Sequence, residues 1–473
     1  MVDLHLPIDR AKGGLAAQVS RALRDSIRSG RLRPGEQLPA TRELARDLRL
    51  SRGVIVEAYE QLVAEGFLVS RVGAGTRVAE TVAGARGGED DDGADASGLD
   101  GGHSGAEGRA TTYYGYRPTS PDLSMFPRQR WLAALRHVLT TVPHDALDYG
   151  DPGGAPELRE ELAAYLRRVR AADASATNLV IVSGVAQALS LTVRALAGEG
   201  RVRLAVEDPT TPRPLPLLRS AGAELVPVPV DEEGMDAGAL RRSGAEAVLL
   251  TPAHNYPTGV VLSPRRRAEI AAWAAETGAT VLEDDYDAEF RFDRDPVGCL
   301  QGLAPDRVVL AGSVSKSLAP GLRLGWLVAP APIAEAVRNA REAQDLGSPV
   351  IDQYALAHFV ATGAYDRHLR RMRREYRTRR DALVRALAEH LPQVRVPGVA
   401  AGLHLYAELP EGWDERKIAD IACAAGLTAE PVAPTRHVPG PPAVVIGFAR
   451  LPAHRIAEAV HDLGRNLGPD VLT

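Results

Sequence analysis

The stretch VVLAGSVSKSLAPGLRLGW, residues 308–326, decides how most of this chain folds and what it can bind. Its first four residues are apolar, which is typical of a strand buried on both faces. Lys316 follows, and only Lys12 and Lys417 are also lysines among the 56 Lys+Arg residues. Arginine stays protonated, whereas a buried lysine can lose its proton and attack a carbonyl group. The choice of lysine here indicates a residue that forms a Schiff base with an aldehyde.

Groups suited to phosphate and to a pyridine nitrogen stand near this lysine. Ser313, Ser315 and Arg323 bracket it with hydroxyl and guanidinium groups. About thirty residues upstream, a second apolar run ends in carboxylates and a phenol, among them Asp284 and Tyr286. An amine, a phosphate clamp and an acid for the pyridine nitrogen are the partners that pyridoxal 5'-phosphate requires. We expect this cofactor; the alternative is an ordinary lysine in a surface loop.

Length and composition bound the class of protein. A chain of 473 residues exceeds the usual size of one core, so two or more domains are expected. No apolar run of membrane length and no signal-like start is present, which predicts a cytoplasmic protein without a membrane partner. Cys299 and Cys423 lie far apart without metal-ligand spacing, so we expect neither a disulfide nor a bound metal.

The charge divides the chain into three parts. Residues 1–78 hold 13 Lys/Arg against 9 Asp/Glu, whereas residues 79–109 hold 2 against 8. The second part is rich in Gly and Asp and has almost no large apolar residues, so it cannot offset the entropy of ordering. We predict a basic head at 1–79, a flexible acidic linker at 80–110 and a body at 111–473. We expect the linker to keep head and body apart as separate units.

The head has the pattern of three helices and a wing. One apolar stripe predicts the first helix, through Leu15, Val19, Leu23 and Ile27. Thr41 is expected to cap a short helix over 42–48, and Ser51 to cap another that ends near residue 65. Alternation of apolar and polar residues around glycines over 66–78 predicts a two-stranded hairpin. The pattern is typical of a winged helix-turn-helix.

This head resembles the winged helix-turn-helix of the GntR family, on the motifs Pro34-Gly-Glu-Gln-Leu-Pro39-Ala-Thr-Arg42-Glu-Leu-Ala, Ser51-Arg52, Ala64-Glu65-Gly66 and Gly73-Ala-Gly75-Thr76. The resemblance implies double-stranded operator DNA as the partner. It places Arg42, Ser51 and Arg52, at helix N-termini, against phosphates or base edges. It also brings Arg71 and Gly75 of the wing close to the DNA backbone. A three-helix module that binds another protein is the alternative.

The body alternates short apolar strands with helical segments, and this order predicts an α/β fold with a mostly parallel sheet covered by helices on both faces. The expected strands begin near residues 179, 204, 225, 248, 280, 308 and 326. A large lobe over about 111–390 is followed by a smaller α/β lobe over about 391–473. In that small lobe we expect strands at 403–409 and 444–449, and helices near 414–425 and 452–467.

The body resembles the fold-type I aminotransferases, on the motifs Tyr149-Gly-Asp-Pro, Ser183-Gly184, Glu207-Asp-Pro209, His254-x-Tyr256-Pro-Thr-Gly259, Glu283-Asp-Asp-Tyr-Asp, Ser313-x-Ser-Lys316 and Pro320-Gly-Leu-Arg323. Joined to the head, it resembles the MocR-type regulators of the GntR family over nearly the whole chain. The resemblance implies that Lys316 carries the cofactor and that Asp284 pairs with the pyridine nitrogen. Tyr286 would bond the phenolic oxygen.

The same resemblance implies a phosphate cup and a dimer. Ser313, Ser315 and Arg323 would hold the phosphate, together with the backbone amides after Gly184, beginning at Val185. Tyr149 would reach across a homodimer interface toward the phosphate of the neighbouring subunit.

Three positions depart from the aminotransferase pattern. Val185-Ala186 replaces a polar pair, and Thr211 stands where an aromatic ring usually stacks on the pyridine. Val445 replaces the arginine that binds a substrate carboxylate, and Arg450 and Arg213 are the nearest substitutes. These changes predict weaker cofactor binding and inefficient transamination.

We therefore expect a pyridoxal-phosphate-dependent transcription regulator that senses a vitamer, amine or amino acid. An active aminotransferase with a fused DNA-binding head is one alternative, and a DNA-binding protein whose body has lost its cofactor is another.

The basic run Arg370–Arg380 is charged nearly all round. It predicts a solvated or dimer-facing helix, or alternatively a second surface for DNA.

Overall fold

The computed structural model describes residues 8–9, 14–71, 75–79, 117–292 and 297–467. The expected linker at 80–110 and the wing tip lie outside the described residues. No helix in the described ranges is both long and apolar enough to cross a membrane.

The head forms the predicted helices and wing, namely α1 (Leu15–Arg28), α2 (Thr41–Asp47), α3 (Arg52–Ala64), β1 (Leu68–Arg71) and β2 (Gly75–Val78). The N-cap at Ser51 is confirmed, because its Oγ accepts a hydrogen bond from the Val54 amide at 3.4 Å. The predicted cap at Thr41 is wrong: Thr41 is the first residue of α2. The Glu43 carboxylate instead accepts the Ala40 amide proton at 3.2 Å.

The body is built on an eight-stranded sheet in the order β3-β10-β9-β8-β7-β4-β5-β6. The five central strands run parallel, whereas β10 is antiparallel to β3 and β9, and β6 to β5. The prediction of a mostly parallel sheet is thus confirmed. The strands are β3 (Leu179–Val182), β4 (Val202–Asp208), β5 (Ala223–Asp231), β6 (Gly234–Met235), β7 (Ala247–Leu250), β8 (Thr280–Asp285), β9 (Val308–Ser313) and β10 (Gly325–Val328).

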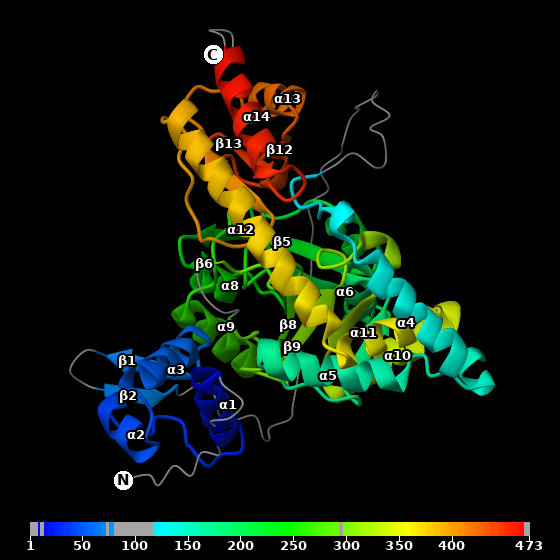
Figure 1. The fold of residues 1–473 in the computed structure, drawn as a ribbon. Coiled ribbons are helices and arrows are strands. Elements are labelled where there is room, and N and C mark those ends of the chain that lie inside the picture. The colour runs from blue at the N-terminus through cyan, green and yellow to red at the C-terminus, as the bar shows by residue number, and fades with distance from the viewer. Residues whose placement is uncertain (1–7, 10–13, 72–74, 80–116, 293–296, 468–473) are drawn as a thin grey trace.

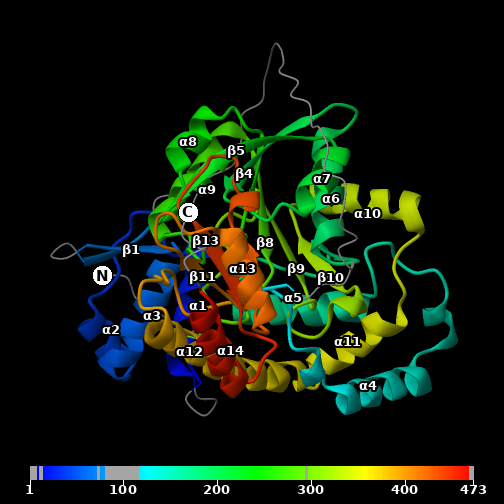
Figure 2. The same ribbon diagram turned by 90° about the horizontal axis from the view of Figure 1, so that it is seen from above.

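Helices cover both faces of this sheet (Figures 1 and 2). One face packs against α6 (Val185–Ala197), α7 (Pro214–Ser220) and α10 (Ala331–Asp345). The opposite face packs against the remaining helices, which are α4 (Arg128–Thr141), α5 (Pro156–Arg170), α8 (Ala237–Arg242), α9 (Pro264–Thr277), α11 (Ile351–Ala361) and α12 (Ala364–His390). Short 3-10 turns lie at Leu123–Met125, His144–Leu147, Pro320–Leu322 and Ala433–Thr435.

The small lobe contains a three-stranded sheet in the order β11-β13-β12. Its elements are β11 (His404–Glu408), α13 (Glu415–Ala424), β12 (Thr428–Pro431), β13 (Ala443–Gly447) and α14 (Ala453–Asn466). The sequence predicted all of these except β12, which is short and carries Glu430 and Pro431 in place of an apolar run.

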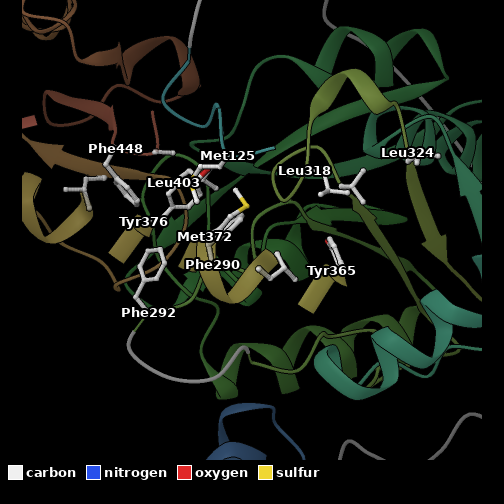
Figure 3. Close-up of a cluster of buried hydrophobic side chains, with 14 of the residues drawn as sticks. Met125, Phe290, Phe292, Leu318, Leu324, Tyr365, Met372, Tyr376, Leu403 and Phe448 are labelled. Atoms are coloured by element: carbon white, nitrogen blue, oxygen red, sulfur yellow. The ribbon is translucent and has the colours of Figure 1, made fainter. Parts of the chain in front are cut away.

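The basic run Arg370–Arg380 lies within α12, a long helix that extends from the large lobe to the small lobe (Figure 1). The run is not charged all round, because Met372 and Tyr376 are fully buried in the core that Figure 3 displays. Arg379 is buried as well, and pairs with Asp122 at 3.0 Å. One face of this segment therefore holds the body together.

The head packs directly on the body (Figure 1). Apolar residues of α1, α3 and β1 share one buried cluster with α8, α9 and with Leu300 and Leu303. The expectation that the two parts are kept apart as separate units is therefore wrong. Amphipathic patterning predicted the apolar stripe of α1, but it gave no information on which surface covers it.

Candidate functional site

Asp284 lies at the carboxyl end of β8, at the edge of the sheet where pockets form in this kind of fold. Burial, together with the neighbouring Asp285 and Asp287, raises its pKa to about 7 against the opposing charge of Lys316. Its Oδ1 atom is buried and has no hydrogen-bond partner among the described residues. A buried carboxylate oxygen without a partner is costly, so this atom fits a protonated ring nitrogen.

Lys316 follows β9, the strand next to β8, and is half-buried. Its Nζ donates a hydrogen bond to Thr119 Oγ1 at 3.4 Å. Burial lowers the pKa of Lys316, with Asp287 and Asp284 opposing and Arg117 reinforcing this effect. A lowered pKa favours the neutral amine, which is the form that attacks an aldehyde.

Tyr286 lies beside a buried histidine that the sequence motif contained but that was given no role. The Tyr286 hydroxyl lies 3.2 Å from Nδ1 of this residue, His254. Nδ1 of His254 also lies 2.9 Å from Asp287 Oδ2. Burial, with Asp287 and Asp284, holds the pKa of Tyr286 well above its usual range, so the phenol keeps its proton. His404 completes a buried group with His254 and Asp287, whose polar atoms lie within 4.8 Å of one another. Since His254 and Asp287 already bond each other, we assign no metal to this group.

A cup for an anion lies at the start of α6. The Ser313 hydroxyl accepts the Ser315 amide proton at 3.3 Å, and Arg323 donates to the Ser183 carbonyl oxygen. Gly184 adopts a φ of 91°, and a Cβ atom there would lie 2.9 Å from the Arg323 guanidinium. Only glycine allows this approach, so the helix N-terminus and the guanidinium converge on one small space.

These groups fit pyridoxal phosphate. The partnerless Asp284 oxygen suits the pyridine nitrogen, the Tyr286 phenol suits the ring oxygen, and the cup at Gly184 and Arg323 suits the phosphate. Lys316 lies close enough to Asp284 for each charge to shift the pKa of the other. The sequence reasoning thus named a set of residues that the fold brings to one end of the sheet.

Other predicted positions lie outside this set. Tyr149 is 83 % exposed. Val445 is fully buried in β13, so it offers no group to a carboxylate. Arg213 is exposed at the start of α7.

The head presents the predicted DNA-contacting residues to solvent. Arg42, Ser51 and Arg52 are exposed at the starts of α2 and α3. Gly75 has a φ of 79°, and a Cβ atom there would lie 3.1 Å from the Gln37 side chain. The side chain of Arg71 lies outside the described residues.

A short segment, residues 297–304, joins this site to the head, and we call it the docking segment. Glu283 accepts the amide protons of Leu300 and Gln301, both at 2.9 Å. Asp285 pairs with Arg170 at 2.8 Å. Because neighbouring side chains of a strand point to opposite faces, Asp284 faces the cofactor groups while Glu283 and Asp285 hold the docking segment.

The head contacts the other side of the docking segment. Arg28 of α1 donates to the Gly302 carbonyl oxygen at 2.7 Å and also to the carbonyl of Ala171. A Cβ atom at Gly298 would lie 2.9 Å from the Glu65 side chain. Glu65 itself is buried and paired with Arg24 at 2.7 Å. Head and cofactor site thus share one segment of backbone.

Comparisons with known proteins agree with both halves. Residues 121–462 match the family model described as aminotransferase class I and II, and residues 15–78 match that of bacterial regulatory proteins of the gntR family. The probable rhizopine catabolism regulatory protein MocR of Rhizobium meliloti is 30 % identical over 455 residues, covering 94 % of this chain and 92 % of that protein. The pyridoxine biosynthesis regulator PdxR of Corynebacterium glutamicum is 32 % identical over 398 residues, or 82 % of each chain.

Among solved structures, the body is similar to the kynurenine aminotransferase of Pyrococcus horikoshii, a structure in complex with PMP. The TM-score is 0.68 at 27 % identity, covering 74 % of this chain and 89 % of that one. Fold and site thus define a class, that of aminotransferase-like proteins with a winged helix-turn-helix head. Within it, the chain belongs to the aminotransferase class I and II family and, through its head, to the MocR-type branch of the gntR family.

Proposed function

We propose that this protein is a DNA-binding transcription regulator of the cytoplasm whose body holds pyridoxal phosphate and senses an amine-bearing ligand. The observation that carries the proposal is the docking segment. Its backbone is held by Glu283 on one side and by Arg28 of the head on the other. A cofactor bound beside Asp284 would therefore act on β8, the strand that holds the docking segment against which the head packs.

The cofactor is held by the groups at the carboxyl end of the sheet. Lys316 attaches it, Asp284 and Tyr286 orient its ring, and Gly184 and Arg323 hold its phosphate. When bound, pyridoxal phosphate supplies an aldehyde that reacts reversibly with amines. Burial lowers the pKa of Lys316, which favours its neutral amine, and raises the pKa of Tyr286, which favours its protonated phenol; both forms suit the binding of this group.

The coupling follows from the charge balance on β8. Without cofactor, Asp284 lies beside Asp285 and Asp287 and takes up a proton near neutral pH. A bound pyridinium would hold Asp284 ionised, which changes the charge facing Asp285 and its partner Arg170. Arg170 also donates to the Val297 carbonyl, at the start of the docking segment. A ligand shifts the head only through such a difference between two states.

A competing function, that of a working aminotransferase, has less support. The position that would bind a substrate carboxylate is Val445, fully buried in β13. The position that would stack on the pyridine is Thr211, which has no aromatic ring. The two family matches place a regulator head on this body, and the relatives matched over most of their length are named as regulators.

We further propose that the protein is a homodimer. Large apolar side chains are exposed on α4, in the residues that follow it and at the end of α10, namely Leu132, Leu139, Leu147, Tyr149 and Leu346. Exposed apolar side chains of this size support an interface with a second copy of the chain. Two heads on a dimer would contact paired half-sites one helical turn apart or at multiples of it.

Gel-shift titration of an operator fragment tests the function. The fragment would come from the promoter region upstream of the gene itself. We expect cofactor-loaded protein to retard it and Arg52→Ala to bind roughly 5- to 150-fold more weakly. Failure of the wild-type protein to prefer this fragment over scrambled DNA would contradict the regulator assignment.

A further inference from the structure

Residues 117–122 form a segment over Lys316, which we call the covering segment. It carries Arg117, a cation that none of the sequence motifs contains. Pro118 lies on Gly447 of β13, where a Cβ atom would come within 2.5 Å of its carbonyl oxygen. Thr119, the next residue, accepts the hydrogen bond of Lys316 Nζ. Asp122 fixes the far end of the segment, because its carboxylate pairs with Arg379 and its amide donates to Tyr376 Oη at 2.9 Å.

Arg117 begins this covering segment, and its guanidinium group is incompletely paired. One terminal nitrogen, Nη1, is buried and has no hydrogen-bond partner among the described residues. Among the described residues, Arg117 forms no ion pair with a carboxylate within 4.0 Å. Asp122 pairs instead with Arg379, and Asp287 with His254. A buried donor without an acceptor costs about 1–3 kcal/mol, and more for a charged group. An anionic ligand would supply the acceptor that this donor lacks.

The surroundings of Arg117 place that anion next to the reactive amine. The charge of Arg117 contributes to the lowered pKa of Lys316, after burial. It also opposes the rise in the pKa of Tyr256 that burial and Glu430 cause. The charge of Arg117 thus acts on both Lys316 and Tyr256, and Thr119, two residues further along the same segment, contacts Lys316 directly.

The same corner of the pocket is where the usual carboxylate-binding arginine is missing. Tyr256 packs against the small apolar cluster that contains Val445 and Tyr406. Val445 pairs with Glu430 in the sheet, and Glu430 accepts the Tyr256 hydroxyl proton at 3.1 Å. An arginine at 445 would meet this carboxylate, whereas Arg117 belongs to the segment that packs on Gly447 through Pro118.

We propose that Arg117 binds the carboxylate of the ligand, and that the ligand is an amino acid whose amine faces Lys316. The proposal rests on the proposed sensing function. It excludes simple amines and neutral vitamers as preferred ligands, because these leave the Arg117 nitrogen without an acceptor. The phosphate of the cofactor is not the anion in question, since the cup for it lies at Gly184 and Arg323.

The test is a titration of cofactor-loaded protein with a panel of amino acids, each paired with the amine that lacks its carboxylate. The readout is the change in the visible absorption of the cofactor. For the wild type we expect at least one amino acid to act at a concentration about tenfold or more below that of its paired amine, the effect of one charge-assisted hydrogen bond. In Arg117→Ala the two should act alike. Arg117→Lys should restore part of the preference.

Arg213→Ala and Arg450→Ala are the matched controls, because these arginines are the nearest alternatives in sequence. Both should keep the wild-type preference. The assignment is overturned if Arg117→Ala keeps it, if one of the controls loses it, or if the wild type prefers amines. An unchanged cofactor spectrum and unfolding temperature in Arg117→Ala exclude general misfolding. Operator binding measured in the same samples separates the two proposals, because an amino-acid preference without a DNA response contradicts the sensing function alone.

Discussion

Replacing Arg28 by alanine should release the head from the body. Arg28 donates two hydrogen bonds to the Gly302 carbonyl, at 2.7 and 3.2 Å, and a further one to Ala171. Hydrogen bonds from a charged donor contribute about 1.5–3 kcal/mol each, so loss of the pairing with two carbonyls weakens docking by about 3 kcal/mol. At 1.36 kcal/mol for each factor of ten, this is roughly a hundredfold change in the docking equilibrium.

Hydrogen exchange measured by mass spectrometry is the assay for Arg28→Ala. Amides of the docking segment should exchange faster in the variant, because the head no longer covers them. Arg31→Ala is the matched control, since Arg31 is exposed on the same part of the head and bonds only Ser29 among the described residues. In the variant, cofactor should no longer change operator affinity. Exchange that matches the Arg31→Ala control would refute the docking role of Arg28.

Three further predictions concern the site and the head. Borohydride treatment of the cofactor-loaded protein, followed by peptide mapping, should place the pyridoxyl group on Lys316; Lys417→Ala should leave labelling intact, and labelling of Lys12 or Lys417 instead would contradict the assignment. Arg52→Ala should weaken operator binding by about 1–3 kcal/mol in a gel shift while Arg395→Ala, on the exposed edge of the small lobe, should not. In cofactor-free protein the raised pKa of Asp284 means that the folded state binds a proton more tightly than the unfolded chain, so the contribution of Asp284 to stability falls as the pH rises from about 4 to about 7. Thermal unfolding across this range should show a smaller fall for Asp284→Asn, and equal slopes would count against the raised pKa.

Local patterns were sufficient to predict which side chains the fold gathers at one edge of the sheet. Asp284 and Lys316 each follow a continuous apolar run, and neighbouring parallel strands bring their carboxyl ends to the same edge. The Ser51 cap was predicted for a similar reason, because a side-chain oxygen before a helix acts on residues only three positions away.

The contacts that give the site its surroundings could not be predicted in this way. Arg28 bonds Gly302 across 274 residues of sequence, and Thr119 reaches Lys316 across 197. No periodicity links positions so far apart. The close approaches at Gly298 and Gly447 likewise depend on the segment that packs against each glycine. The role proposed for Arg117 likewise depends on the contact between Thr119 and Lys316, which only the fold reveals.

The central claim is that occupancy of the body changes DNA binding by the head. The direct measurement is a titration of one operator fragment with cofactor-free, cofactor-loaded and amino-acid-treated protein at a single salt concentration, because phosphate contacts depend strongly on salt. We predict that the affinity for DNA differs between these forms by about 5- to 150-fold, the usual range of allosteric coupling, and that Lys316→Ala removes the difference. Equal affinity in all three forms, matched by Lys316→Ala, would contradict it.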